Sequence, residues 1–442
     1  MFERPRAGER AVLVRAGIGA AVRAEDLEEF EQLALSAGAQ PVAQVTGRME
    51  RPNPRFFVGS GKAEEIAAVA REQNADVVLF DHPLSPSQER NLEKLIERRV
   101  LDRSGLILDI FAQRARSFEG KLEVELAQLK HIASRLVRGW THLERQKGGI
   151  GMRGPGETQL ETDRRLLGNR VRSLTRRLEK LKQQRETGRS ARVEIPIPSV
   201  ALVGYTNAGK STLFRALTGS DAYVADQLFA TLDPTVRRLQ LPGGVHVVLA
   251  DTVGFIRDLP HELVAAFQST LQEARDANLL LHVVDASDPH RDARIEEVDA
   301  VLGQIGAGAL PQLRVYNKID RLEVQPHLER DAEGRVVQAW VSAVGGSGLE
   351  GLLQAVGERL DLGVRRSWLQ LPPGAGALRS RLYQSGVVRG ERSDEQGAMQ
   401  LQVELPEREL EQLLGRGAVR LLSEAACTAS DSYLESLPAR QR

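Results

Sequence analysis

Short apolar runs alternate with stretches of helical spacing over the first 110 residues. The run Asp76–Asp81 is typical of a buried strand, whereas apolar positions recur every three or four residues from Glu25 to Ala37. This alternation predicts a small α/β layered domain. The other strands expected here are 10–15, 42–45 and 56–58, and the other helices are 62–73 and one around 92–96.

The spacing changes to a heptad pattern between about 118 and 192. Two series of apolar residues are spaced alternately by four and three, as in paired helices. The segment between them, Lys147–Glu157, is too rich in glycine and proline for a helix. We therefore expect an antiparallel helical hairpin with arms of about 25 residues, on the order of 35–40 Å long. Its seam residues are Leu122, Leu126, Leu129, Ala133, Leu136 and Trp140, then Leu167, Val171, Leu174, Leu178 and Leu181.

Buried-strand patterns return after the prolines at 196 and 198. Strands are expected at 200–203, 236–241, 245–250, 279–284, 313–316 and 336–341. In the tail, the alternating stretches Leu378–Val388 and Met399–Leu405 predict strands, and Glu407–Leu414 predicts a short helix. The fold class is therefore α/β. We expect an N-terminal α/β domain at 1–112, a helical hairpin at 113–195, a nucleotide-binding domain at 196–362 and a small α+β domain at 363–442.

The amino-acid composition restricts the cellular compartment in which we expect the protein. The single cysteine, Cys427, excludes a disulfide framework and a cysteine-based zinc site. The first residues lack an apolar signal core, and no stretch approaches the roughly 20 apolar residues of a membrane span. We expect a soluble cytoplasmic protein with no membrane span. The formal net charge of the 442 residues is +0, so the average charge says nothing about a nucleic-acid partner.

The charge of the hairpin region differs from this neutral average. From Ile110 to Ile195 there are 20 Lys and Arg residues against 10 Asp and Glu. A solvated coiled-coil surface would mix the two signs, whereas a basic rod suits the phosphates of RNA. The glycine-rich tip carries Ile150 and Met152, so it is either a flexible probe for a confined site or simply a long turn. The basic residues of the second arm are Arg164, Arg165, Arg170, Arg172, Arg176, Arg177, Lys180, Lys182 and Arg185.

A phosphate-binding loop follows the apolar run at 200–203. It fits the pattern G-x-x-x-x-G-K-[ST] and precedes a helix, which is the context that the pattern needs. Lys210 would bridge the β- and γ-phosphates, and the Ser211 hydroxyl would ligate Mg²⁺. A similar segment, Gly59–Lys62, lacks the first glycine and is expected to be a turn into a helix. The predicted loop consists of Gly204, Tyr205, Thr206, Asn207, Ala208, Gly209, Lys210, Ser211 and Thr212.

Two further motifs follow in the order of a GTPase. Thr231 is the candidate switch threonine, whose hydroxyl would join Mg²⁺ when a γ-phosphate is present. Asp251 would hold Mg²⁺ through its coordination shell, and the Gly254 N–H could contact the γ-phosphate, which requires close backbone approach. The residues assigned to nucleotide binding here are Phe229, Ala230, Thr231, Leu232 and Asp233, then Asp251, Thr252, Val253 and Gly254.

A base-reading motif ends the strand at 313–316. In Asn317-Lys318-Ile319-Asp320, the Asp320 carboxylate can accept from both N1–H and the exocyclic amine of guanine. Adenine offers an acceptor at N1, and an unsatisfied buried polar group costs about 1–3 kcal/mol. The backbone of Ser342 and Ala343 would meet the guanine O6. GTP and GDP are therefore the expected ligands.

One position departs from the pattern of Ras-like proteins. Phe255 follows the D-x-x-G motif where those proteins have a glutamine that orients the attacking water. Hydrolysis would then need a group from a partner, from another loop or from a cation. Asn207 sits where some GTPases bind K⁺, although it could equally stabilise the loop.

Taken together, these segments resemble the HflX family, in the Obg-like branch of translation-factor GTPases. The motifs that carry the resemblance are those beginning at Gly204, Phe229, Asp251 and Asn317, together with the hairpin loop from Gly148 to Glu161. The resemblance covers about residues 10 to 360. It implies binding to the large ribosomal subunit and its rRNA, splitting of stalled ribosomes, and a loop tip placed near the peptidyl transferase centre. It also implies weaker ATP binding in the N-terminal domain.

We therefore expect a GTPase that acts on ribosomes as a monomer and does not bind DNA. An alternative is a GTP-dependent coiled-coil adaptor that regulates a protein partner without RNA. A small-molecule kinase on the same fold is disfavoured by Asn317 and Asp320, which read guanine.

Overall fold

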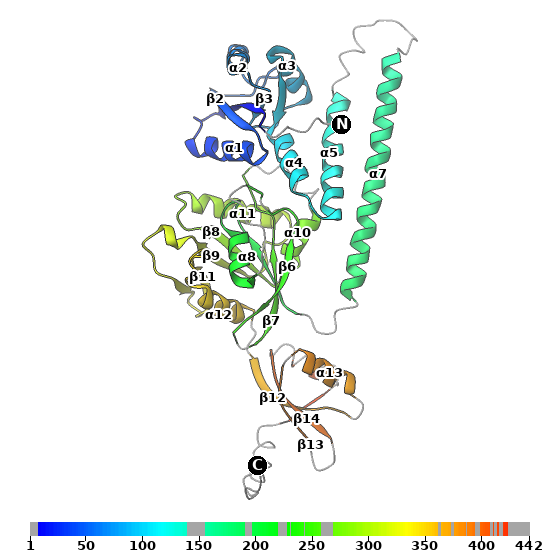
Figure 1. The fold of residues 1–442 in the computed structure, drawn as a ribbon, viewed down its shortest axis with the longest axis vertical. Helices are drawn as coiled ribbons and strands as arrows, with labels where there is room; N and C mark the ends of the chain where they lie inside the picture. The colour runs from blue at the N-terminus through cyan, green and yellow to red at the C-terminus, as the bar shows by residue number, and fades with distance from the viewer. Residues whose placement is uncertain are drawn as a thin grey trace, which may run out of the picture.

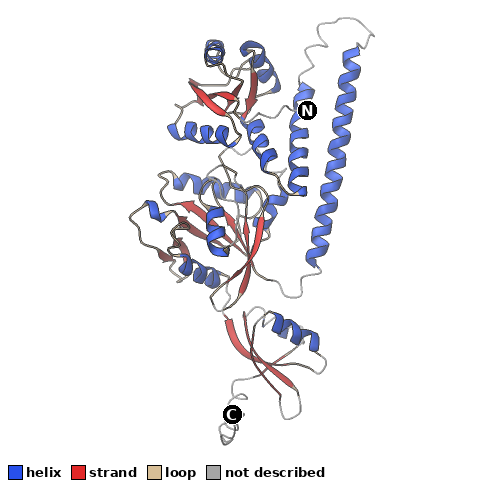
Figure 2. Ribbon diagram, viewed as in Figure 1, coloured by secondary structure: helices blue, strands red, loops and turns tan. Residues whose placement is uncertain are grey.

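The computed structural model contains three sheets and a helical hairpin, arranged along the long axis of the molecule (Figure 1). Helices cover the first two sheets on both faces, and α13 packs beside the third sheet (Figure 2). The structure describes residues 8–138, 155–190, 197–219, 228–229, 231–242, 244–257, 268–360, 364–372, 375–385, 387–393, 398–406, 410, 413–414 and 419–422. None of the helices described in these ranges combines the length and the apolar character that a membrane span requires.

The N-terminal sheet is parallel, with the strand order β2-β1-β3-β4. Its central strand β3 is buried at all four positions, as its unbroken apolar run predicts. The elements are β1 (Arg10–Ile18), α1 (Ala24–Ser36), β2 (Gln40–Met49), α2 (Ser60–Glu72), β3 (Val77–Phe80), α3 (Pro86–Ile96), β4 (Arg99–Asp102) and α4 (Arg103–Arg114).

Two details of this region differ from the sequence prediction. Residues 56–58 form no strand, because Phe57 has a φ of +64° and closes a tight turn onto Asn53. The strand β4 and the helix α4 were not predicted, since β4 has only four residues and passes directly into the helix. The segment at Gly59 is a turn into α2, as expected.

The hairpin is formed by α5 (Phe118–Arg138) and α7 (Pro155–Ser190), which lie side by side (Figure 1). The heptad seam is confirmed where it is described: Leu122, Leu126 and Leu174 are buried together. The second arm is longer than expected, because Pro155–Glu157 is helical rather than part of the loop. Proline is well suited to the first position of a helix. The predicted tip residues Ile150 and Met152, and the seam residue Trp140, lie outside the described residues.

The central sheet has seven strands in the order β10-β11-β9-β8-β5-β7-β6, parallel except at its two edges. The short edge strand β10 was not predicted. The elements are β5 (Ser199–Val203), α8 (Lys210–Thr218), β6 (Thr235–Gln240), β7 (His246–Asp251), α10 (Gln268–Arg275), β8 (Leu279–Asp285), α11 (Arg291–Gln304), β9 (Gln312–Asn317), the 3₁₀ turn η1 (Ile319–Arg321), β10 (His327–Arg330), β11 (Val336–Trp340) and α12 (Leu349–Arg359).

One apolar core joins the first two sheets. It runs from Leu13, Leu79 and Phe111 to Val203 and Phe255 in the central region. The first three residues belong to the first sheet and its helices, β1 to α4, which we call the N-terminal half. The opposite faces of the two sheets have separate cores. The N-terminal half is therefore packed directly against the edge of the central sheet where the phosphate-binding loop lies.

The last sheet is antiparallel, with the order β13-β14-β12-β15. The prediction of a strand from Leu378 to Val388 is wrong over its first part, where the chain forms α13. The predicted helix at 407–414 lies mostly outside the described residues. The elements are β12 (Val364–Gln370), α13 (Gly376–Gln384), β13 (Val388–Ser393), β14 (Met399–Pro406) and β15 (Arg420–Leu422).

Candidate functional site

The phosphate-binding loop turns sharply between β5 and α8. Gly204 has a φ of +145° and Gly209 a φ of +92°, both in the region that favours glycine. A Cβ on Gly204 would also collide with the carbonyl oxygen of Val283 in β8. The loop therefore has the form that points backbone N–H groups, and the positive end of α8, at an anion.

Lys210 is almost fully buried inside this loop. Its Nζ donates to the carbonyl oxygens of Gly204 at 3.1 Å and Tyr205 at 2.7 Å. Burial lowers the pKa of Lys210 to about 8, against the opposing effect of the Asp251 carboxylate. The charge is thus held at the place where phosphate oxygens would stabilise it.

Three oxygen-bearing side chains meet beside Lys210. The Ser211 hydroxyl donates to Asp251 Oδ2 at 2.7 Å, and the Thr231 hydroxyl donates to the same oxygen at 3.0 Å. The two hydroxyl oxygens are 2.8 Å apart. Asp251 Oδ1 is buried without a hydrogen-bond partner among the described residues, and burial raises the pKa of this carboxyl. An all-oxygen set with an orphaned carboxylate oxygen fits Mg²⁺.

The D-x-x-G segment supports the same corner of the site. The hydroxyl of the fully buried Thr252 donates to the carbonyl oxygen of Leu202 at 2.5 Å, and Val253 is packed in the core. A Cβ on Gly254 would lie 2.8 Å from Thr206 Cγ2 and 3.0 Å from Lys210 Nζ. The backbone at Gly254 therefore approaches the loop as closely as the sequence motif predicts.

The base-reading motif is built around buried Asn317 at the end of β9. Its side-chain nitrogen donates to the carbonyl oxygen of Ala208 at 3.0 Å, and its side-chain oxygen accepts from the Ala343 N–H at 3.0 Å. This one side chain ties the phosphate loop to the loop after β11. Asp320 remains exposed and accepts a hydrogen bond from the buried Ser342 hydroxyl. Its carboxylate is therefore available to a base.

Lys318 links the base-reading motif to the phosphate-binding loop. Its Nζ donates to the carbonyl oxygen of Asn207 and to Asp285 Oδ2, both at 2.7 Å. Asp285 was not predicted. It ends β8, the strand beside β5, so its place at the carboxyl end of a central parallel strand was the available signal.

Three of the predicted nucleotide-binding side chains point away from the pocket. Phe229 and Leu232 are buried in the shared core. Asp233 contacts the start of the hairpin through the N–H groups of Arg116 and Ser117. Only Thr231 of this segment reaches the oxygen cluster, and Ala230 lies outside the described residues. The motif was predicted from the sequence, but the different directions of its side chains were not.

Phe255 has no place in the pocket either. Its ring is buried in the core shared with the N-terminal half. Its backbone pairs with the phosphate loop, since the Phe255 N–H donates to the Gly204 carbonyl oxygen and the Thr206 N–H to the Phe255 carbonyl oxygen. Phe255 therefore supports the loop through its backbone, and its buried ring cannot orient a water molecule.

The N-terminal half reaches the pocket through charged side chains that the sequence did not single out. Glu29 in α1 accepts a hydrogen bond from the Tyr205 hydroxyl, and the same hydroxyl accepts from the Arg257 N–H at 3.0 Å. Arg103 donates to the Arg257 carbonyl oxygen at 2.8 Å. Because these residues come from segments far apart in sequence, no local pattern marks them.

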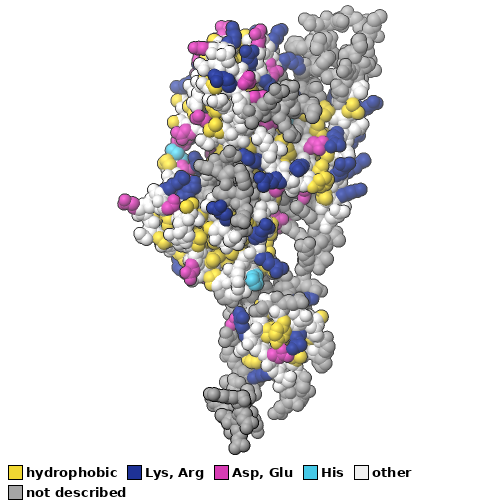
Figure 3. All heavy atoms as spheres, viewed as in Figure 1, with side chains coloured by type: hydrophobic (Ala, Val, Ile, Leu, Met, Phe, Trp, Pro, Cys, Tyr) yellow, Lys and Arg dark blue, Asp and Glu magenta, His cyan; other side chains and the backbone are white. Residues whose placement is uncertain are grey.

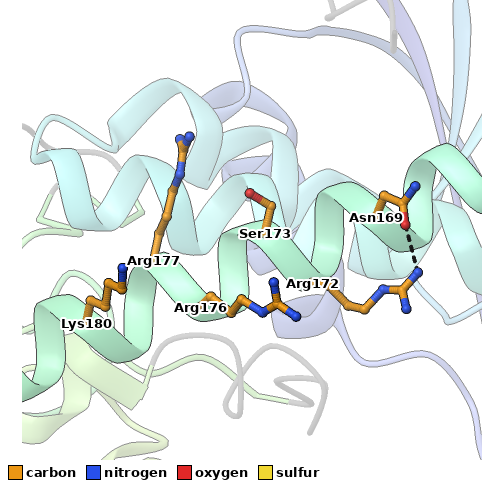
Figure 4. A pocket seen from close by; sticks show the side chains of 6 residues that line it. All are labelled: Asn169, Arg172, Ser173, Arg176, Arg177 and Lys180. Atoms are coloured by element: carbon orange, nitrogen blue, oxygen red, sulfur yellow. Dashed lines mark hydrogen bonds between the residues drawn. The ribbon is translucent and has the colours of Figure 1, made fainter.

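A second feature lies on α7. Exposed cations line a hollow of ≈ 460 Å³ on its outer face (Figure 4), and dark blue side chains project along the same helix in Figure 3. In the part of the chain that the structure describes, no carboxylate pairs with these cations, whereas Arg170, which lies nearer α5, pairs with Glu125 of that helix at 2.6 Å. The lining residues are Asn169, Arg172, Ser173, Arg176, Arg177 and Lys180.

Family models match most of the chain in four consecutive pieces. Residues 24–112 match "GTP-binding GTPase N-terminal" and residues 114–192 match "GTP-binding GTPase Middle Region". Residues 199–318 match "50S ribosome-binding GTPase", and residues 327–422 match "HflX C-terminal domain".

Curated relatives match over nearly the full length. The chain is 58% identical to GTPase HflX of Escherichia coli (strain K12) over 407 residues, which is 92% of this chain and 96% of the relative. It is 49% identical to GTPase HflX of Caldanaerobacter subterraneus subsp. tengcongensis, over 81% of this chain and 82% of the relative.

Solved structures give a more distant likeness. One is the crystal structure of a GTP-binding protein from the archaeon Sulfolobus solfataricus in complex with GDP. It is 24% identical, with a TM-score of 0.43, and the match covers 80% of this chain and 98% of that chain.

Proposed function

The chain belongs to the HflX family of GTPases, and we propose that it binds the large ribosomal subunit and splits stalled ribosomes in a GTP-dependent manner. The description of the family model matched by residues 199–318, which names 50S ribosome binding, supports this proposal. We assign nucleotide binding to the central sheet and contact with rRNA to the hairpin, and we expect the protein to act as a monomer.

The guanine site is assigned to Asp320 with Asn317, Ser342 and Ala343. The exposed Asp320 carboxylate would accept from N1–H and the 2-amino group, and the backbone beside Ala343 would meet O6. Adenine would leave the carboxylate facing an acceptor, which costs about 1–3 kcal/mol or more for a charged group. The pocket should therefore discriminate strongly against ATP.

Phosphate binding is assigned to Lys210 and the loop around it, and Mg²⁺ binding to Ser211 and Thr231 with Asp251. Bound Mg²⁺ would neutralise charge on the β- and γ-phosphates. Lys210 would exchange its contacts with two loop carbonyls for phosphate oxygens. The Gly254 N–H would approach the γ-phosphate, because only glycine leaves room beside Thr206 and Lys210.

Hydrolysis needs a group that Phe255 cannot supply. Asn207 has a φ of +60° and an exposed side chain, while Lys318 holds its carbonyl oxygen. The side-chain amide of Asn207 could therefore turn toward a K⁺ ion bound beside the phosphates. We expect faster GTP hydrolysis in K⁺ buffer than in Na⁺ buffer, and equal rates would reject this role.

The basic face of α7 is the observation that carries rRNA binding. Arg172, Arg176 and Lys180 follow one another at intervals of four, so they line one side of the helix (Figure 4). A row of cations at helical spacing matches a phosphate backbone, and each contact releases counterions from the RNA. A protein partner in an adaptor role would instead require acidic or apolar complementarity.

Cosedimentation with ribosomes at about 50 and 200 mM salt tests this proposal. In the presence of a non-hydrolysable GTP analogue we expect salt-sensitive binding. Changing Arg172, Arg176 and Lys180 to glutamine should weaken it and lower the slope of log affinity against log salt by about two to three, because each phosphate contact contributes about 0.7–0.9.

A matched triple variant controls for the change in net charge. Arg51, Arg71 and Lys94 are exposed in the N-terminal half, and replacing them with glutamine should leave the salt slope unchanged. If the wild-type protein remains in the supernatant with every nucleotide, the adaptor alternative is favoured. If both triple variants behave alike, α7 is not the contact surface.

A further inference from the structure

Leu228 and Phe229, which precede Thr231 in the chain, are held by the N-terminal half of the chain. The Leu228 N–H donates to the Ser36 hydroxyl oxygen at 3.0 Å. The Phe229 ring meets the Phe111 ring edge-on, with centroids 4.7 Å apart. Phe229 also has a φ of +55°, an uncommon backbone conformation for a bulky residue. These contacts fix the segment on the side remote from the nucleotide pocket.

Asp233 attaches this segment to the root of the hairpin. Its Oδ2 accepts from the N–H groups of Arg116 at 2.6 Å and Ser117 at 2.8 Å, and its Oδ1 accepts from the Ser117 hydroxyl. The same hydroxyl oxygen accepts from the Gly120 N–H at 2.9 Å, which caps the first turn of α5. A carboxylate bound to backbone N–H groups at a helix N-terminus is favourably placed.

Gly120 shows how closely the two parts fit. A Cβ at this position would collide with Asp233 Oδ1. The backbone of Gly120 has no need of glycine otherwise, because it lies inside α5, where alanine is more favourable. The absence of a side chain thus leaves room for Asp233.

Only a short piece of chain separates Thr231 in the oxygen cluster from Asp233 at the start of α5. Thr231, which contacts Ser211 and Asp251, lies two residues before Asp233, a span of at most about 7 Å. Leu232 between them is buried, and Thr235 begins β6 in register with Asp251. A displacement of Thr231 must therefore move Asp233 or break its hydrogen bonds.

A second attachment holds α5 farther along. Arg135 forms ion pairs with Glu89 at 2.7 Å and Asp102 at 2.9 Å in the N-terminal half. It lies 18 residues after Ser117, so the two attachments are separated by roughly 27 Å of helix. If the root is released while Arg135 stays bound, the helix tilts, and α7 with its basic face tilts with it.

We propose that Asp233 is a positioning residue that transmits the nucleotide state to the basic hairpin. The contact of Thr231 with the oxygen cluster and the hold of Asp233 on the root of α5 coexist in this structure, and we assign this arrangement to the GTP state. After hydrolysis Thr231 leaves the cluster and Asp233 releases the root. This inference rests on the proposed function, since it names the regulation of the same ribosome-binding surface.

Amide hydrogen exchange of a peptide covering residues 113–124 tests the coupling without ribosomes. In the wild-type protein, exchange should be slower with a GTP analogue than with GDP. In Asp233→Ala it should be fast and equal in both states. Equal exchange in both states of the wild-type protein would overturn the proposal, because a merely structural contact would not respond to nucleotide.

Cosedimentation with ribosomes at saturating nucleotide gives the functional readout. The wild-type protein should bind more tightly with the GTP analogue than with GDP, and this affinity ratio should approach one in Asp233→Ala. A variant that keeps the full ratio would refute the coupling. The wild-type protein could also fail to bind ribosomes while the amide exchange of residues 113–124 still depends on the nucleotide. That result would reject the ribosomal function but support the coupling.

Two further variants separate coupling from folding. Gly120→Ala keeps Asp233 but pushes it away, and it stabilises rather than weakens the helix, so it should reproduce the loss of coupling. Asp331→Ala removes a similar carboxylate from a turn remote from the pocket, where Asp331 accepts from the N–H groups of Glu333 and Arg335. It should behave like the wild-type protein.

Discussion

Lys210 shows how one side chain is prepared for its ligand. Its ammonium group is buried, and the carbonyl oxygens of Gly204 and Tyr205 and the nearby Asp251 compensate its charge. Burial therefore lowers its pKa to about 8 before a phosphate arrives. Bound phosphate raises the pKa again, so binding is linked to proton uptake above this pH.

The affinity for GDP should accordingly depend on pH. Because the pKa is about 8 in the free protein and higher in the complex, the full affinity is present below pH 8 and is lost as pH rises above it. We expect a decrease of about tenfold per pH unit above 8, equivalent to about 1.4 kcal/mol. Titration of a fluorescent GDP between pH 7 and 8.8 measures this change.

Guanosine provides the control for this titration. It lacks phosphates, so its binding reports only the base, whose own N–H groups also titrate at alkaline pH. If guanosine and GDP lose affinity in parallel, Lys210 does not control the pH dependence.

At the scale of elements, the hairpin depends on a narrow seam. Leu174 of α7 is fully buried between Leu122 and Leu126 of α5, while Leu166, two turns earlier on the same helix, is 57% exposed. Among the described residues, this seam and the ion pair between Arg170 and Glu125 hold α7 beside α5, whereas Arg172, Arg176 and Lys180 on the outer face take no part in the seam. The packing contacts and the proposed RNA contact therefore lie on opposite sides of one helix.

Leu174→Ala should destabilise the hairpin by roughly 2–3 kcal/mol, because it removes a buried side chain from a small cluster. Leu166→Ala changes an exposed position and should cost less than about 0.5 kcal/mol. Amide exchange across residues 118–135 and 165–181 measures both. Equal effects of the two substitutions would contradict the seam that the heptad pattern predicts.

At the scale of the whole molecule, ion pairs connect the N-terminal half to Arg257 in the central region. Arg15, Arg103 and Arg257 alternate with Asp26, Glu29 and Asp81 in a closed ring of ion pairs. Burial alone would lower the pKa of Arg103, but the carboxylates of Asp81 and Glu29 raise it. Arg257 lies three residues after Gly254 of the D-x-x-G motif, so the ring connects the N-terminal half to the central sheet.

Asp81→Asn should weaken this ring severely. The Asp81 side chain is fully buried between Arg15 and Arg103, so its neutralisation leaves two cations without their shared partner. We expect a loss of about 3–5 kcal/mol in the free energy of unfolding. Denaturant unfolding measures it, with Glu333→Gln as the control, since the pair of Glu333 with Arg335 is exposed to solvent and contributes little to stability. Similar losses in both variants would argue against the ring.

The sequence by itself determined the elements that depend on local pattern. Heptad spacing predicted the seam of α5 and α7, and the motif spacings brought Lys210, Ser211, Thr231 and Asp251 to one corner, because consecutive parallel strands end at the same edge of a sheet. Local pattern did not predict α13, where alternation resembled a strand.

Only the tertiary structure decided which distant residues meet. Glu29 reaches Tyr205, and Asp233 turns from the expected pocket to the hairpin root. Such contacts depend on how one folded unit docks on another, which no spacing along the chain encodes. Side-chain direction in an irregular loop is likewise set by packing, so Phe229 and Leu232 are buried while Thr231 between them faces the oxygen cluster.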